Sequence, residues 1–260
     1  MSEYVSVAEA RNKPGLRLIL SPGVPGPWTE GIKGIFDVKK ISYARARQDI
    51  GGDYSDLLDW SAQAAAPVAA WNDEWPRISW IDQLNLAERL QPEPKLIPDN
   101  IHDRALMFGL CNELLGQNGL VWMRRLMIMQ PTMSDPQSQP EEVRNFLTFF
   151  ANKYHYDAHQ AEAASGRVAT ILKALSGQLA SQKAKGCEFL VGDHLSALDI
   201  YWATSAAILD PLPHDLCPMP DNFREFYSTI DAEIEAALDP ALLEHRNFIY
   251  QEYLVLPLDM

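Results

Sequence analysis

The chain has 260 residues, with 35 acidic and 22 basic side chains and a formal net charge of −13. An acidic surface repels phosphate backbones and anionic lipids, so we expect neither nucleic acid nor a membrane as partner. No apolar run approaches the roughly 18 residues that a membrane span requires, and residues 1–15 lack the apolar stretch of a signal peptide.

The three cysteines, Cys111, Cys187 and Cys217, are far apart and form no CxxC pair. Neither a zinc ribbon nor a dithiol redox centre is therefore expected, and the histidines show no ligand spacing that would indicate a metal site. An odd number of scattered cysteines is typical of a reducing compartment, so the sequence favours the cytoplasm.

The first part of the chain mixes strand and helix patterns. Residues 16–20 (LRLIL) are short, apolar and bounded by turn signals, which indicates a buried strand. The remaining expected elements are helices at 28–38, 54–63 and 79–90 and strands at 41–47, 67–71 and 76–78. This order is β-α-β-α-β-β-α. Gly31 and Gly34 weaken their helix in isolation but would let it pack closely on a sheet.

A connector with two prolines, residues 91–95, is the clearest domain boundary. We expect one domain at 1–91 and a second at 99–260. Nothing in the second resembles a strand, so its class is all-α. Helices are expected at 100–129, 141–159, 161–183, 197–209, 221–237 and 240–252.

The most informative motif is FLVGDHLSALDI at 189–200. Ser196 and Asp199 have the spacing of a capping box, in which each side chain bonds the backbone N–H of the other residue. Leu195 and Ile200 can form the hydrophobic staple that accompanies such a cap. The helix that follows is apolar almost all round, so it should be buried. We therefore expect Ser196 and Asp199 to shape the fold rather than to contact a ligand.

This motif resembles the capping box at the central helix of the cytosolic glutathione transferases, where it follows a Phe-Leu-x-Gly-Asp loop. Together with the order of elements, the resemblance implies an N-terminal thioredoxin-like domain that binds glutathione and a C-terminal all-helical domain. It also implies a homodimer.

The resemblance assigns two glutathione-binding segments. Ala66-Pro67 stands where the family has a cis-proline, whose preceding residue pairs with the cysteine of glutathione; the alternative is a trans proline opening an edge strand. Ile78-Ser79 stands where the family has an acidic residue or Gln and then Ser, which bind the γ-glutamyl group. Ile78 departs from that pattern. Ser79 has Asp82 three residues later, so it can equally be a plain helix cap.

The catalytic position of the family falls on Thr29, in a Gly-Pro-Trp-Thr turn that resembles the usual S-P-x-S/C turn. A threonine can donate a hydrogen bond to the glutathione sulfur but cannot form a mixed disulfide. Trp28 is assigned to the glutathione site beside it, although Trp28 and Trp71 are also plausible packing residues. The alternatives are that Thr29 only begins a helix, or that Ser21 takes its place.

For the second substrate, the resemblance places Phe108 and Cys111 in the electrophile pocket, with Trp122 and Met123 on the same helix. The spacing of these residues is also that of an ordinary core stripe. The neighbouring pair Arg124-Arg125 could bind an anion or could be solvated.

The leading hypothesis is a transferase that adds the glutathione thiolate to a small hydrophobic electrophile, with glutathione as co-substrate and no metal. The alternative is a glutathione-transferase-like binding or interaction protein without catalysis. A dithiol oxidoreductase is disfavoured because CxxC is absent.

Overall fold

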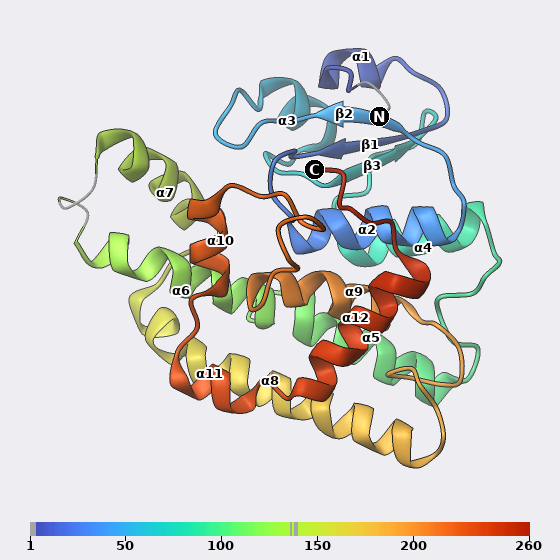
Figure 1. Cartoon of the computed structure of the whole chain (residues 1–260). Helices are drawn as coiled ribbons and strands as arrows, with labels where there is room; N and C mark the ends of the chain where they lie inside the picture. Colours follow the sequence, from blue (N-terminus) through green and yellow to red (C-terminus); the bar gives the residue numbers. More distant parts are fainter. Residues whose placement is uncertain (1–3, 136, 138–139) are drawn as a thin grey trace.

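The computed structural model describes residues 4–135, 137 and 140–260. A small sheet with helices on both sides forms one part of the molecule, and a bundle of helices forms the other (Figure 1). The elements of the first part are α1 (Val7–Arg11), β1 (Leu16–Leu20), α2 (Pro27–Val38), β2 (Ala44–Arg47), α3 (Ser55–Ser61), β3 (Val68–Trp71) and α4 (Trp80–Leu90). Those of the second are α5 (Ile101–Leu115), α6 (Leu120–Ser134), α7 (Glu141–Lys153), α8 (Ala158–Ala184), α9 (Ala197–Ser205), η2 (Ala206–Ile208), α10 (Asp221–Ser228), α11 (Ala232–Ala237) and α12 (Pro240–Tyr253).

The strands lie in the order β2-β1-β3, with β1 parallel to β2 and antiparallel to β3. The sequence predicted a fourth strand at 76–78, and this is wrong as an element. Only Arg77 pairs there, in an isolated bridge to Ala69. Proline has no N–H to donate, so Pro76 cannot extend that ladder.

Strand β1 is buried on both faces because its side chains alternate between two apolar layers. Leu16, Leu18 and Leu20 belong to the large core that continues through α2 into the helical bundle. Ile19 belongs to a smaller core shared with α1 and α3 on the opposite face of the sheet. The sequence prediction of a buried strand at 16–20 is confirmed.

Helix α1 was not predicted. A capping box between Ser6 and Glu9 begins it, and Val7 and Ala10 are buried. The preceding Val5 pairs with Ala46 in a parallel bridge beside β2. A helix of one turn is too short to produce a periodic pattern, although its Ser-x-x-Glu signal is present in the sequence.

The predicted helix at 100–129 is broken, which corrects the sequence analysis. Helix α5 ends at Leu115, and α6 begins after the N-cap Gly119. A Cβ on Gly119 would lie 2.7 Å from the carbonyl oxygen of Glu113, so the chain can turn this tightly only with glycine. Asn118 in the same turn has a φ of 61°. The expected helix at 221–237 is likewise divided, into α10 and α11.

The predicted capping box at the start of α9 is confirmed. The Asp199 carboxylate accepts hydrogen bonds from the backbone N–H of Ser196 (2.9 Å), from the Ser196 hydroxyl (2.7 Å) and from the N–H of Leu190 (2.8 Å). It also contacts His245 Nε2 of α12 at 2.9 Å, a partner that the sequence did not reveal. These contacts join the loop before α9, the helix itself and α12 in the core.

Gly31 and Gly34 do allow close packing, but against the helical bundle rather than the sheet. A Cβ on Gly31 would lie 2.7 Å from the ring of Tyr201 in α9. A Cβ on Gly34 would lie 2.8 Å from the Leu254 side chain. Helix α2 therefore joins the sheet to α9 through a surface made of small residues.

Candidate functional site

The predicted glutathione-binding segments lie at one edge of the sheet. Ile19 is opposite Val68 in the β1–β3 pairing, so the end of β1 adjoins the start of β3. The loop that leads to α2 leaves from this end of β1. The peptide bond between Ala66 and Pro67 is cis, as the resemblance implies. The start of β3 therefore lies beside the end of β1 from which residues 21–26 lead to α2.

Thr29 lies in the first turn of α2, as the sequence predicted. This helix begins at Gly26, which offers no side-chain cap, and its first helical residue is Pro27. The backbone N–H groups of Trp28 and Thr29 are thus left without a capping side chain. Thr29 is 8% exposed, and no described residue forms a hydrogen bond with its hydroxyl. Its oxygen lies 3.5 Å from the place that a Cβ on Gly26 would take.

Ser79 is the N-cap of α4. Its hydroxyl accepts a hydrogen bond from the Asp82 N–H (3.2 Å) and donates one to the Asp82 carboxylate (2.6 Å). Gln83 in the same turn donates to the carbonyls of Pro67 (3.0 Å) and Arg77 (3.1 Å). The first turn of α4 is therefore fixed against the start of β3, which brings Ser79 to the same edge as Pro67.

The neighbouring Ile78 is exposed, with 39% of its surface accessible. Its apolar side chain stands where the family has a polar one, so the γ-glutamyl end would find fewer donors and acceptors here.

Other predicted residues are placed elsewhere. Trp71 pairs with Leu16, at the opposite end of the sheet, so it does not flank the site. Cys111 is fully buried, and burial raises the pKa of its thiol well above the usual range. It is a core residue and does not line an electrophile pocket. Phe108 is half-buried against Trp80, with ring centres 6.3 Å apart.

Trp28 connects the first turn of α2 to the helical bundle. Its indole N–H donates to the Leu115 carbonyl at the end of α5 (3.0 Å). Its ring stacks on Tyr154, with centroids 6.3 Å apart. The residue before Thr29 therefore faces the bundle, so this junction joins the first turn of α2 to the helical part of the molecule.

An aromatic cluster, defined here as Trp28, Trp122, Phe150 and Tyr154, occupies this junction. Tyr154 is its centre, 5.1 Å from the Trp122 ring and 5.9 Å from the Phe150 ring. Trp122 and Phe150 are half-buried, so part of the cluster is accessible. The sequence analysis did not identify it, because its members come from α2, α6 and α7. The density of aromatic residues between 146 and 156 is the one available signal.

The Arg124-Arg125 pair is not solvated, which corrects one of the two sequence readings. Arg124 is buried and donates to the carbonyls of Ile208 (3.2 Å) and Thr229 (3.0 Å). Burial lowers its pKa to about 10. Arg124 therefore joins α6 to η2 and to the chain before α11.

Arg125 points to a different environment, between tyrosines. It donates to the Tyr227 hydroxyl (2.7 Å) and is also hydrogen-bonded to Tyr154. Lys153 follows nearby, with its ammonium 5.3 Å from the centre of the Tyr154 ring. Burial, and then the charge of Arg125, lower the Lys153 pKa to about 8.

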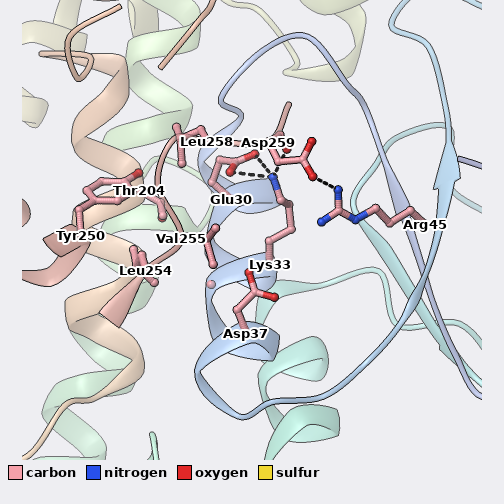
Figure 2. A pocket seen from close by; sticks show the side chains of 11 residues that line it. Glu30, Lys33, Asp37, Arg45, Thr204, Tyr250, Leu254, Val255, Leu258 and Asp259 are labelled. Atoms are coloured by element: carbon pink, nitrogen blue, oxygen red, sulfur yellow. Dashed lines mark hydrogen bonds and ion pairs between the residues drawn. The ribbon is translucent and has the colours of Figure 1, made fainter. Parts of the chain in front are cut away.

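A cavity of about 130 Å³ lies on another side of α2, beside α12 and the C-terminal residues (Figure 2). Lys33 in its wall donates to the Glu30 carboxylate (2.9 Å) and to the Asp259 carbonyl (2.6 Å), and Asp259 also pairs with Arg45. No predicted site residue lines this cavity. Glu30, Lys33, Arg45 and Asp259 thereby hold the C-terminal residues against α2, whereas the Asp37 carboxylate forms no hydrogen bond or ion pair with a described residue.

Among residues 4–135, 137 and 140–260, no three His, Cys, Asp or Glu side chains lie together as a metal site would require. In the same described part of the chain, no helix combines the length and the apolar character needed to cross a membrane.

No family model and no curated protein matches this sequence. Solved structures do match. A glutathione S-transferase from Methylobacillus flagellatus, with glutathione bound, superposes with a TM-score of 0.62 at 13% identity, over 92% of this chain and 96% of that one. Glutathione transferase Omega 3C from Trametes versicolor superposes with a TM-score of 0.58 at 15% identity, over 96% of this chain and 91% of that one. Rice GST1 in complex with glutathione superposes with a TM-score of 0.59 at 16% identity, over 95% of this chain and 94% of that one.

These matches cover more than nine-tenths of the chain on each side of the comparison. The chain has the two-domain fold of the glutathione transferases, a thioredoxin-like domain followed by an all-helical domain.

Proposed function

We propose that this protein is a glutathione-dependent transferase, in which the glutathione thiolate attacks a small hydrophobic electrophile. The observation that carries the proposal is that Gln83 fixes the first turn of α4, which Ser79 caps, to the start of β3 at Pro67, beside the end of β1 from which the chain leads to the uncapped first turn of α2. The solved structures with bound glutathione support the choice of co-substrate.

In this proposal the backbone of Ala66 pairs with the cysteine of glutathione, and Ser79 with the first turn of α4 receives the γ-glutamyl carboxylate. The helix N-terminus suits that role because its free N–H groups attract anions. The Thr29 hydroxyl donates to the sulfur. A thiolate is the reactive form of a thiol, and a donated hydrogen bond together with the positive end of α2 favours the thiolate at neutral pH.

Replacing Thr29 tests the catalytic assignment. Thr29→Val removes the hydroxyl and keeps the shape, so the pKa of bound glutathione should rise by about one to two units, as expected for losing a hydrogen bond to a charged group. Thr29→Ser retains a hydroxyl, so bound glutathione should keep most of its lowered pKa. Thiolate absorbance titrated against pH measures this without knowledge of the electrophile. Identical titrations of wild type and Thr29→Val would remove Thr29 from the mechanism.

Replacing Ser79 tests the binding assignment. Ser79→Ala should weaken glutathione binding by about 1–3 kcal/mol, the range for a lost hydrogen bond to a charged group. Calorimetry gives the affinity, and a denaturation curve separates it from the loss of the α4 cap. Equal affinities for both proteins would restrict Ser79 to capping.

The second candidate is a protein with this fold that binds glutathione or a partner without catalysis. Two observations favour it: Ser79 already uses its hydroxyl on Asp82, and Ile78 is apolar. The thiolate titration distinguishes the two candidates. A wild-type titration of bound glutathione that matches the free thiol would favour binding without catalysis.

Three further assignments belong to the same proposal. Residues 1–91 form the glutathione-binding domain and residues 99–260 the helical domain. The protein is a homodimer, for which exposed apolar side chains on and before α4 and on α5 provide a surface: Trp75, Ile78, Ile81, Ile101 and Leu106. Its compartment is the cytoplasm, where its free cysteines and glutathione stay reduced.

A further inference from the structure

Two cations beside the aromatic cluster have no acidic partner among the residues that the structure describes. No described carboxylate forms an ion pair with Arg125 or Lys153. Both side chains are half-buried, and charges withdrawn from water in proteins are normally paired, because an isolated charge loses hydration without compensation. In a chain with a net charge of −13, two neighbouring unpaired cations are unexpected.

The ammonium of Lys153 faces aromatic rings. It lies 5.7 Å from the Phe150 ring centre and 5.3 Å from that of Tyr154. Cation–π attraction offsets part of the lost hydration, but burial still lowers the Lys153 pKa to about 8. Lys153 is in the last turn of α7, where a helix favours a cation. A fully solvated lysine would serve that purpose equally well, so the helix alone does not explain the burial.

Arg125 is only partly satisfied. Its guanidinium lies 5.0 Å from the Tyr227 ring and donates to the Tyr227 hydroxyl. Its buried Nε has no acceptor. An arginine presents five donors, so this residue retains capacity for an additional acceptor.

The cations are connected to the proposed reaction centre through Tyr154. Its hydroxyl is hydrogen-bonded to Arg125, its ring lies 5.3 Å from the Lys153 ammonium, and the ring also stacks on Trp28, the residue before Thr29. Tyr154 is only 4% exposed, so the accessible aromatic surface between the first turn of α2 and the cations is that of the half-buried Trp28, Trp122 and Phe150, which pack around it. A flat ring packed on this surface would have one end near the glutathione sulfur and the other near the cations.

We propose that the second substrate is an aromatic electrophile carrying an anionic group, a carboxylate or a sulfonate, and that Lys153 and Arg125 bind this group. The inference rests on the proposed function and specifies its substrate class. For a chloronitrobenzoate, the thiolate sulfur attacks the carbon that bears chlorine. A C–S bond forms, the C–Cl bond breaks, and chloride leaves with the bonding electron pair.

Binding of a matched pair of probes tests the inference without requiring catalysis. A chloronitrobenzoate and its neutral amide differ in charge but hardly in shape, and Trp28 and Trp122 provide intrinsic fluorescence at the site. In the absence of glutathione, wild type should bind the acid at least about tenfold more tightly than the amide, the scale of a hydrogen bond to a charged group. Equal affinities would overturn the inference.

Lys153→Met retains the length of the side chain and removes its charge. This variant should lose most of the preference for the acid, whereas Lys153→Arg should keep it. The matched control is Lys173→Met on the exposed surface of α8, which should behave as wild type. A Lys153→Met protein that still prefers the acid would exclude Lys153 as the anion-binding residue. Circular dichroism of each variant verifies that it is folded.

The carboxylates of glutathione are the other possible source of the anion. If the cations serve glutathione, Lys153→Met should weaken glutathione binding about tenfold and leave the acid-to-amide ratio unchanged, which would overturn the inference. With glutathione present, a selective rise in KM for the acid in Lys153→Met would support it. If wild type prefers the acid but conjugates neither probe, the transferase proposal fails and the anion site stands.

Discussion

Two sides of the molecule hold charged side chains partly or fully withdrawn from water, and the two sides are built differently. Toward the C-terminal residues, Lys33 pairs with Glu30 at 2.9 Å and Arg45 pairs with Asp259 (Figure 2). Toward α6 and α7, Arg125 and Lys153 face tyrosine hydroxyls and aromatic rings. These paired charges hold the C-terminal residues against α2. Unpaired cations leave a preference for an anion from outside, so the comparison separates a structural side from a binding side.

The largest effect is expected from removing the cation of the ion pair between Lys33 and Glu30 on the paired side. Lys33→Met leaves the buried Glu30 carboxylate without its cation and should cost about 3–5 kcal/mol of unfolding free energy. Burial already raises the Glu30 pKa, so the native state binds this proton more tightly than the unfolded chain. The penalty should therefore shrink as pH falls toward the ordinary Glu range of about 4.3.

Urea denaturation at two pH values measures this effect. The double variant Lys33→Met with Glu30→Gln is the control, and it should recover much of the loss because no unpaired charge remains. An unchanged urea midpoint for Lys33→Met would show that the pair is not a structural element.

On the unpaired side, a matching substitution should stabilise the protein rather than destabilise it. Lys153→Met should raise the unfolding free energy by about 1–2 kcal/mol, since it removes a half-buried charge that has no carboxylate partner among the described residues. Urea midpoints compared with those of Lys173→Met provide the measurement. If Lys153→Met is instead less stable than wild type, the ammonium contributes to the fold and the contrast between the two sides disappears.

The smallest effect is a pH dependence that sharpens the comparison. The Lys153 pKa is about 8, so the acid probe should lose affinity as pH rises through this value, by about tenfold overall. Arg125 stays charged throughout. Burial raises the Tyr154 pKa, so this hydroxyl stays neutral. Fluorescence titration between pH 7 and about 9.5 tests this, with the neutral amide as the flat reference. A flat curve for the acid would assign the binding to Arg125 alone.

Sequence reasoning succeeded where the signal was local. The strand at 16–20, the capping box of Ser196 and the first-turn position of Thr29 each depend on residues close together in the chain. The break between α5 and α6 was missed although Gly116 and Gly119 mark it, because the apolar pattern continues on both sides of the turn. The strand at 76–78 failed because pairing depends on a neighbour that the pattern does not specify.

In the candidate site, too, some residues could be placed from the sequence and others could not. Its edge at Thr29, Pro67 and Ser79 could be placed from the order of the elements, since the strand ends and helix starts of a thioredoxin-like domain meet there. Cys111 could not be excluded from the electrophile pocket, because one helix pattern serves core and pocket alike. Trp28, Trp122 and Arg125 were each named from the sequence, but their grouping with Phe150, Tyr154 and Lys153 could not be found, since these residues come from separate parts of the chain.

By itself, the sequence determined the fold class, the two-part organisation and the caps that begin α4 and α9, because propensity, turn chemistry and capping act over a few residues. Only the tertiary structure decided which charges are paired. Arg124, Arg125, Lys33 and Lys153 are all basic residues on helices, and nothing in the neighbouring sequence distinguishes their roles. Their environments depend on which helices pack together, because the free energy of a charge inside a protein is determined by groups that are distant in sequence. Arg125 and Tyr227, for example, are 102 residues apart.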